Sequence, residues 1–160
     1  PMVNVSWRDA MDYADWLSGK LKQKVRLPYE AEWEYAARGG KKSKGYKFSG
    51  GNDAIDVSWL DVNSKNKTNA VARKKPNELG LYDMSGNAFE WCMDKYGNYT
   101  NSPKNNPKGA IEGDQRVVRG GGWNLTTQFC QVAFRYGSRF TGELYDYFGF
   151  RVVSFNKNQE

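Results

Sequence analysis

The stretch RVVRGGGWNLTTQFCQVAFRYGSRFTGELYDYFGFRVV, residues 116–153, decides how this chain is interpreted. A frame rich in glycine and valine lies at each end, RVVRGGGW at 116–123 and GFRVV at 149–153. The segment between them is rich in Tyr, Phe, Thr, Ser, Arg and Asp. Tyrosine supplies rigid contact area with a polar tip, and Ser, Gly and Thr adapt their hydrogen bonds, a mixture typical of antibody paratopes. The segment therefore favours a binding surface over a core or a catalytic pocket.

The chain contains no histidine. This absence excludes Ser–His and Cys–His nucleophilic arrangements and proton transfer by histidine. Carboxylate chemistry stays open, because Asp83, Glu90 and Asp94 are close in sequence. No paired-carboxylate motif or cofactor signature surrounds these three residues, so we favour structural roles for them.

The composition indicates one soluble globular domain over residues 1–160. The chain has 160 residues, 39% of them hydrophobic, with a net charge of +6 and a mean hydropathy of −0.83. No apolar run approaches the roughly 20 residues that a membrane helix needs. Many lysines fall in residues 41–47 and 65–75, which we interpret as solvated loops, because no nucleic-acid motif accompanies them. Two cysteines, Cys92 and Cys130, either pair or are both buried thiols.

The periodicity predicts two helices and several short strands. Residues 6–18 form an amphipathic helix with a capping box, Ser6 followed by Asp9, that ends at Gly19. Residues 29–38 form a second helix, which ends at Gly39-Gly40. Residues 41–80 and 97–115 are predicted to be largely irregular. Strands are predicted over residues 89–93, 116–119 and 150–154.

Four motifs together resemble the formylglycine-generating-enzyme domain family. They are RLPYEAEWEYAARGG (26–40), PNELGLYDMSGNAFEWCMD (76–94), RVVRGGGW (116–123) and GFRVV (149–153), in the order of the family. The resemblance implies an α+β, C-type lectin-like fold with two helices, several short antiparallel strands and much irregular loop. The family domain has a further N-terminal portion that this chain lacks, and an opening at Pro1 is typical of a fragment.

The resemblance includes catalytic branches, which can be tested residue by residue. The oxidase branch is similar to a copper enzyme with two cysteines, and soft thiolates suit Cu(I). Alignment of GGGWNLTTQFC places Cys130 at the second cysteine and Leu125 at the first. Leucine cannot bind a metal, so copper-dependent oxidation is expected to be absent. The iron-dependent sulfoxide-synthase branch uses histidines and is excluded.

A structural calcium ion is one interpretation of the GNAFEW segment. In some members of the family, the residues equivalent to Asn87 and Glu90 resemble calcium ligands, and oxygen donors suit this hard cation. The alternative is a turn asparagine and a buried glutamate that hold the loop by hydrogen bonds. Apart from this ion, no cofactor is expected.

A further branch of the family comprises the variable proteins of diversity-generating retroelements. In this branch, adenine-directed mutagenesis rewrites the end of a C-type lectin domain, and residues 116–153 resemble that variable region. AAC template codons cannot become Lys, Met or Trp codons, and none of these residues occurs between Asn124 and Tyr147. Gln128, Gln131 and Glu143 cannot arise in this way either and are interpreted as fixed.

The leading hypothesis is therefore a non-enzymatic, ligand-binding display protein. Its expected contact residues lie inside the frame: Leu125, Thr126, Thr127, Phe129, Phe134, Tyr136, Ser138, Arg139, Phe140, Thr141, Leu144, Tyr145, Asp146 and Tyr147. Some aromatic residues, especially Phe129, Phe134 and Phe148, could instead belong to the core. We expect Cys130, Val132, Ala133 and Arg135 to be scaffold.

The resemblance also implies where the protein acts and what it binds. We expect a monomer on the bacterial cell surface, lipid-anchored through an upstream segment, without membrane insertion of its own and without nucleic acid. Its ligand would be a protein or another cell-surface molecule. The alternatives are an oxidase of the formylglycine-generating type with an altered metal site, and a sugar-binding lectin. No calcium-lectin sugar motif such as EPN or QPD is present.

Overall fold

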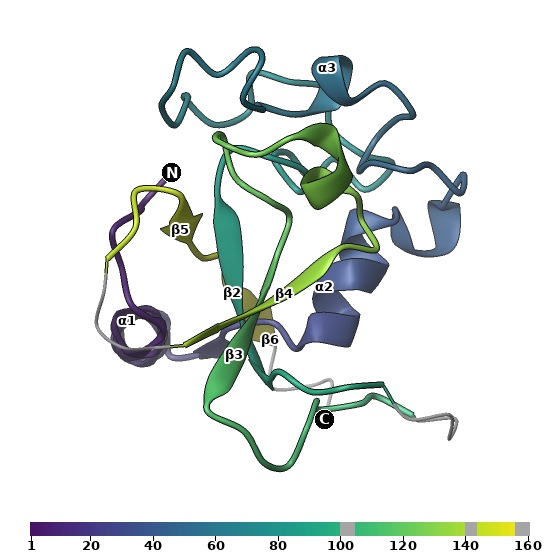
Figure 1. Cartoon of the computed structure of the whole chain (residues 1–160). Coiled ribbons are helices and arrows are strands. Elements are labelled where there is room, and N and C mark those ends of the chain that lie inside the picture. Colours follow the sequence, from purple (N-terminus) through teal and green to yellow (C-terminus); the bar gives the residue numbers. More distant parts are fainter. Residues whose placement is uncertain (100–104, 140–143, 156–160) are drawn as a thin grey trace.

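A four-stranded sheet forms the centre of the computed structural model, which describes residues 1–99, 105–139 and 144–155 (Figure 1). Its strands are β2 (Phe89–Lys95), β3 (Gln115–Arg119), β4 (Arg135–Arg139) and β5 (Phe148–Gly149), in the order β4-β3-β2-β5. The pairs β2–β3 and β3–β4 are antiparallel, whereas β5 lies parallel to β2. The variable region therefore supplies β3, β4 and β5, three of the four strands.

Helix α1 (Trp7–Leu21) begins at the predicted capping box. The Ser6 hydroxyl accepts a hydrogen bond from the Asp9 backbone N–H at 3.1 Å, and Asp9 Oδ2 accepts one from the Ser6 backbone N–H at 2.9 Å. The predicted end at Gly19 is wrong, because the helix continues for two more residues. It ends where Lys22 adopts a left-handed conformation, with φ of 53°.

Helix α2 (Glu30–Ala37) follows a second, two-stranded sheet. Strand β1 (Lys24–Arg26) pairs antiparallel with β6 (Val153–Phe155). The segment between the two long helices therefore contacts the last described strand. Glu32 closes the first turn of α2, accepting from the Tyr29 backbone N–H at 2.8 Å and from Arg26. As predicted, the helix gives way to Gly39, which has φ of 89°.

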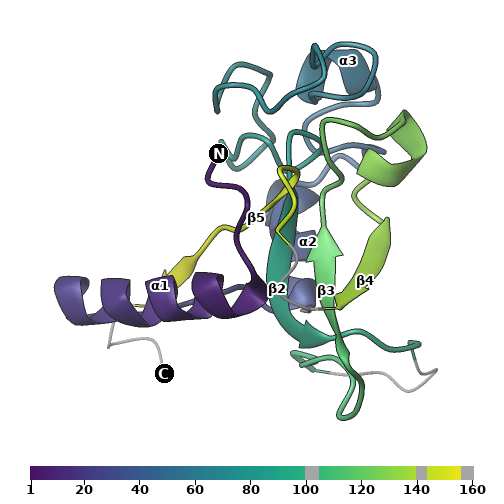
Figure 2. The ribbon, with the colours of Figure 1, turned by 60° about the vertical axis from the view of Figure 1, so that its left-hand side comes forward.

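The pleat of the sheet separates two cores, because successive side chains along a strand point to opposite faces. Phe89 and Trp91 of β2 pack with Val118, Phe148 and Ala10 of α1. Cys92 and Val117 pack on the other face with Trp33 and Ala37 of α2. The two long helices thus cover opposite faces of one sheet (Figures 1 and 2).

The predicted α+β, C-type lectin-like class is confirmed, with four local corrections. A third α-helix, α3 (Ala54–Val57), follows the N-cap Asp53 within the stretch expected to be irregular. Strand β1 was not predicted, and of the strand expected over 150–154 only residues 153 and 154 are strand, in β6, while β5 ends just before it. The β2–β5 pair also departs from the antiparallel expectation. Short 3₁₀ turns complete the described elements, η1 (Gly40–Lys42) and η2 (Thr127–Cys130).

Candidate functional site

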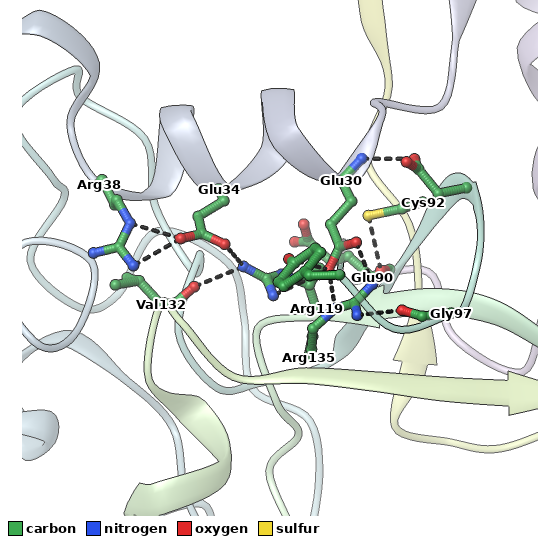
Figure 3. Close-up of polar contacts among 11 residues, drawn as sticks. Glu30, Glu34, Arg38, Glu90, Cys92, Gly97, Arg119, Val132 and Arg135 are labelled. Carbon is green, nitrogen blue, oxygen red and sulfur yellow. Dashed lines mark hydrogen bonds and ion pairs between the residues drawn. The ribbon is translucent and has the colours of Figure 1, made fainter. Parts of the chain in front are cut away.

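Arg119, the last residue of β3, anchors the first part of the frame in a buried ion network (Figure 3). Its fully buried guanidinium forms ion pairs with Glu30 and Glu34 on α2. Nη2 also donates to the Val132 carbonyl at 2.8 Å. The RVVRGGGW motif is therefore tied to the RLPYEAEWEYAARGG motif through Glu30 and Glu34, and to the segment before β4 through Val132.

Arg135, the first residue of β4, reaches the same glutamate from the variable region. Its Nε and Nη2 donate to the two Glu30 carboxylate oxygens at 2.7 and 2.6 Å, a bidentate pair. Nη1 donates to the Gly97 carbonyl at 2.6 Å. The guanidinium also lies 4.6 Å and 4.0 Å from the ring centroids of Tyr96 and Tyr99. The expectation that Arg135 is scaffold agrees with these contacts.

Arg151 anchors the second part of the frame. Its Nε and Nη2 donate to the two oxygens of Glu90 at 2.6 and 2.7 Å, and Trp33 Nε1 donates to the same carboxylate at 2.6 Å. Burial by itself lowers the pKa of Arg151, but the Glu90 carboxylate outweighs this effect and raises it. The GFRVV motif is thereby bound to the GNAFEW motif.

These contacts bear on the calcium interpretation of Asn87 and Glu90. The Asn87 amide is engaged by the Asn69 backbone, with Oδ1 accepting at 2.9 Å and Nδ2 donating at 3.1 Å. The Glu90 carboxylate is already paired with the Arg151 guanidinium. As arranged, the two side chains do not fit a calcium site. They fit the alternative, in which both hold the loop by hydrogen bonds.

Gly121 allows the frame to pass close to η2. Its φ is 79°, and a Cβ there would lie 2.5 Å from Cys130 Sγ and 2.7 Å from the Phe129 carbonyl oxygen. Only glycine adopts this conformation without strain and leaves this space. The close backbone approach expected of the glycine run is present at this position, and it involves the Cys130 thiol and the Phe129 backbone but the side chain of no predicted contact residue.

Most of the predicted contact residues reach the surface. Thr126, Thr127, Tyr136, Arg139, Leu144 and Asp146 are exposed, with 49% of Tyr136 and 53% of Leu144 accessible. Five others are half-buried: Leu125, Phe129, Phe134, Tyr145 and Tyr147. We call these eleven residues the variable face. Phe140 and Thr141 lie outside the described residues.

Three tyrosines of the variable face rest on two phenylalanines of the core. Tyr136 stacks on Phe89 with ring centroids 6.0 Å apart, and Tyr145 and Tyr147 lie 5.2 and 5.1 Å from Phe148. Burial raises the pKa of Tyr147, with smaller contributions from Tyr136 and Asp146. Because Phe89 also contacts Phe148, the three tyrosine rings lie over one aromatic cluster of the core.

Two expectations about individual side chains need correction. Ser138 is buried although it shares a face of β4 with the exposed Tyr136, and it lies opposite Arg116 in the β3–β4 pair. Ala133, expected to be scaffold, is exposed, since it precedes β4 and the pleat does not govern it. Phe148 is core, as the alternative interpretation held, and Phe134 packs partly against the same cluster.

Residues 1–155 match the FGE-sulfatase family, which is described as the Sulfatase-modifying factor enzyme 1-like domain. The chain belongs to the FGE-sulfatase family. Its fold is similar to that of Treponema denticola variable protein 1, with a TM-score of 0.87, 30% identity and coverage of 95% of this chain and 70% of that one. The resemblance to a variable protein is thereby confirmed.

Other FGE-sulfatase relatives are longer proteins. The chain is 37% identical over 157 residues to the serine/threonine-protein kinase pkn1 of Chlamydia pneumoniae, covering 96% of this chain and 24% of that protein. It is 38% identical over 144 residues to the formylglycine-generating enzyme of Streptomyces coelicolor, covering 81% and 44%. The chain spans less than half the length of these two curated relatives.

The two cysteines of this FGE-sulfatase domain are both free and buried. Burial raises the pKa of Cys130 to about 12, and it raises the pKa of Cys92 well above its ordinary value. Both thiols are therefore protonated at neutral pH, whereas a metal ligand or nucleophile must be a thiolate. Leu125 packs beside Cys130 in an apolar cluster. The pair Leu125 and Cys130 does not fit a copper centre.

Asp94 provides a pH-sensitive contact at the start of α2. Its Oδ2 accepts from the Glu30 backbone N–H at 2.7 Å. Burial raises its pKa from 3.8 to about 6, and the carboxylates of Glu30 and Glu32 add to the shift. The folded state therefore binds this proton more tightly than the unfolded state does. Ionisation of Asp94 consequently lowers the free energy of unfolding as pH rises from about 4 to about 6.

We expect Asp94→Asn to remove this contribution, because the amide oxygen can still accept from Glu30 and carries no charge. The free energy of unfolding of the wild type minus that of D94N should decrease from pH about 4 to about 6 and be constant above about 7. Urea denaturation of both proteins across this range measures the difference. A difference that does not change with pH would contradict the assignment.

Proposed function

We propose that this chain is a non-enzymatic ligand-binding domain whose variable face is the contact surface. The observation that carries the proposal is that the buried arginine anchors of the frame are separate from the exposed side chains of the variable face. Arg119, Arg135 and Arg151 are held by glutamates in other motifs, whereas the exposed members of the variable face make few contacts on which the fold depends. Surface substitutions away from such anchors usually change stability by less than about 0.5 kcal/mol. The frame can therefore keep its shape while its face changes.

The chemistry of the face suits recognition of a protein or another large surface molecule. It combines the rings of Tyr136, Tyr145 and Tyr147 with the charges of Arg139 and Asp146. Aromatic residues and arginine dominate the energetics of protein interfaces. Because the rings rest on Phe89 and Phe148, they lose little conformational freedom on binding.

Diversification by a retroelement is the origin that we propose for this face. The similarity to a variable protein of Treponema denticola and the lack of Lys, Met and Trp between Asn124 and Tyr147 support it. Sequencing of the surrounding genome tests it. We expect a nearby copy of the segment that encodes residues 116–153, differing almost only at adenines, together with a reverse transcriptase gene. Independent isolates with identical sequences and no such copy would remove this part of the proposal.

An oxidase of the formylglycine-generating type is the second candidate, because curated relatives carry that name. We expect no oxidation of a cysteine in a sulfatase-type peptide, with or without copper, since Leu125 offers no thiolate. We also expect both thiols to react with a disulfide reagent only after denaturation, because Cys92 and Cys130 are buried and protonated. Turnover by the wild-type protein would overturn the non-enzymatic proposal.

Leu125→Cys is the matched variant for this assay. It supplies the missing thiol outside the frame motifs. After denaturation, the number of cysteines that react with the disulfide reagent should be one higher than in the wild type. Turnover in L125C alone would show that Leu125 is what prevents the chemistry. Inactivity of both proteins would show that Leu125 is not the sole obstacle to the chemistry.

We further propose that the domain is displayed on the bacterial cell surface through an upstream, lipid-anchored segment. Within the described ranges, no helix is both long and apolar enough to cross a membrane. Protease treatment of intact cells tests the proposal. A surface-displayed domain would be degraded, whereas a cytoplasmic control protein would survive.

A further inference from the structure

The positive charge of the chain is concentrated in residues 41–75, which we call the basic lobe. The lobe contains nine lysines and arginines but only three aspartates, a net charge of +6. This equals the net charge of the whole chain, so the acidic and basic residues elsewhere balance one another. When the next two acidic residues along the chain, Glu78 and Asp83, are included, the net charge is still +4. The lobe is therefore the basic part of an otherwise neutral domain.

Most cations of the lobe take no part in holding the fold. Lys75 pairs with Asp56, and Lys74 donates to the Ile55 carbonyl and lies 4.2 Å from the centroid of the Trp59 ring. Seven further cations are exposed and form no ion pair with a carboxylate among the described residues: Lys41, Lys42, Lys44, Lys47, Lys65, Lys67 and Arg73. The three arginines that anchor the frame are, by contrast, each paired with a glutamate. Charges that the fold does not use remain available to an approaching ligand.

The basic lobe adjoins the variable region at η2 (Figure 1). The Asp61 backbone N–H donates to the Leu125 carbonyl at 3.2 Å, and the Val132 backbone N–H donates to the Lys47 carbonyl at 3.1 Å. Four apolar residues of the lobe pack with Cys130 at the end of η2: Phe48, Ala54, Val57 and Leu60. The exposed Lys47 therefore lies at the junction between the lobe and the variable region.

Lys67 lies at a second junction. Asn69 Nδ2 donates to the Lys67 carbonyl at 3.1 Å, and the Asn69 backbone N–H donates to Asn87 Oδ1 at 2.9 Å. The Asn87 carbonyl accepts from the Trp123 backbone N–H at 3.0 Å, and Trp123 Nε1 donates to the Asp146 carbonyl at 3.3 Å. Two exposed acidic residues belong to these junctions, and three exposed lysines outnumber them: Asp61 and Asp146 against Lys47, Lys65 and Lys67.

Positive charge beside a binding surface favours acidic ligands through the rate of association. A surface potential of several kT concentrates ligands of opposite charge and raises association rates by about 10- to 1,000-fold. It also suppresses partners of like charge. The variable face does not add to the positive charge, because Arg139 is paired with Asp114 and Asp146 is acidic. The lobe is therefore the source of positive potential beside the face.

We propose that the basic lobe biases the ligands of the variable face towards acidic proteins. This inference rests on the proposed function, in which the variable face binds a protein. Because the lobe lies outside residues 116–153, its charge stays the same when the face changes. The face then decides which protein is bound, while the lobe decides the sign of the charge on that protein.

Two surface variants of one green fluorescent protein, one strongly acidic and one strongly basic, are probes that differ in charge and not in fold. Clones that bind each form can be selected from a library on this chain, with Thr126, Thr127 and Leu144 randomised to uncharged residues. Surface plasmon resonance measures the rates. For the acidic form, we expect Lys65→Gln, Lys67→Gln to slow association about two- to fourfold at low salt and to leave dissociation unchanged. The difference should vanish at about 1 M salt, where the Debye length is about 3 Å. Association with the basic form should become faster.

Lys20→Gln, Lys22→Gln is the matched control, because it also removes two exposed lysines. Lys22 has φ of 53° and Lys65 has φ of 61°, so each double variant changes one residue in the left-handed conformation. Lys20 and Lys22 lie at the end of α1 that points away from the sheet (Figure 2). We expect the control to associate with the acidic form at the rate of the parent clone. Equal slowing in both double variants, or in neither, would overturn the proposal.

Tyr136→Ala in the same clones separates this inference from the proposed function. If Y136A loses affinity while K65Q/K67Q associates at the parental rate, the variable face binds its ligand and only the role of the lobe is refuted. If Y136A keeps full affinity, the proposed function itself fails. A DNA duplex tests the other class of polyanion. Binding of the duplex at physiological salt that K65Q/K67Q weakens would assign the lobe to nucleic acid and overturn the proposal.

Discussion

Replacement of Arg119 by methionine is expected to lower the free energy of unfolding by about 3–5 kcal/mol, the usual cost of removing one partner of a buried ion pair. The guanidinium is fully buried, and its loss leaves the carboxylates of Glu30 and Glu34 without a shared cation. Arg135 still pairs with Glu30, but no other described cation replaces Arg119 beside the buried side of Glu34. The Val132 carbonyl also loses its donor.

Urea denaturation measures this loss, with Arg139→Met as the matched control. Arg139 is an exposed arginine of β4 that pairs with the exposed Asp114, and a surface pair of this kind contributes at most about 1 kcal/mol. The double variant Arg119→Met, Glu34→Gln should recover part of the loss, because it removes one of the unpaired charges. If R119M and R139M proved equally stable, the network would not be the anchor of the frame.

Local features of the fold were predictable where the interactions themselves are local. The capping box of Ser6 and Asp9 involves neighbours three residues apart and is confirmed. The end of α1 was placed too early, because Gly19 tolerates a helical conformation and the left-handed residue is Lys22 instead. Strand β5 has two residues and a parallel partner, and so short a segment has no periodicity of its own.

The anchors of the frame could not be derived from sequence patterns, since their partners are far apart in the chain. Arg119 and Glu30 are 89 residues apart, and Arg135 and Glu30 are 105 residues apart. Sequence analysis placed Arg135 in the scaffold but identified none of its partners. A cavity of about 920 Å³ that is lined by Tyr35, Ile111 and Arg135 gave no sequence signal either, because these residues converge only in the folded chain.

The exposure of the variable region was predicted well on loops and less well on the strand. Thr126, Thr127 and Leu144 are exposed as expected, but Ser138 is buried. Composition identifies which residues suit an interface, whereas the neighbours that the fold places beside each residue, such as Arg116 opposite Ser138, decide which of them stay exposed. A binding role for individual positions therefore stays a prediction, and Tyr136 offers the sharpest test of it.

Truncation of Tyr136 should remove most of the affinity of the variable face for a selected ligand. A display library on this frame, randomised at Thr126, Thr127, Leu144 and Asp146 with Tyr136 kept, can be selected against a purified test protein. In a selected clone, Tyr136→Ala is expected to weaken binding by about 2 kcal/mol, about 30-fold, as for an aromatic hot spot. Calorimetry or surface plasmon resonance measures the change.

The structure explains why this loss should belong to binding and not to folding. Tyr136 is half exposed and stacks on Phe89, which keeps its contacts with Phe148 and the core when the tyrosine ring is removed. Tyr136→Phe keeps the stacking and should retain most of the affinity, while Tyr13→Ala and Tyr35→Ala remove similarly exposed rings elsewhere and should retain all of it. Clones that bind without loss in Y136A, or that lose affinity equally in Y13A, would place the contact surface outside the variable face. A fixed frame with an exchangeable face predicts that Y136A loses affinity for the ligand while its melting temperature stays that of the parent clone.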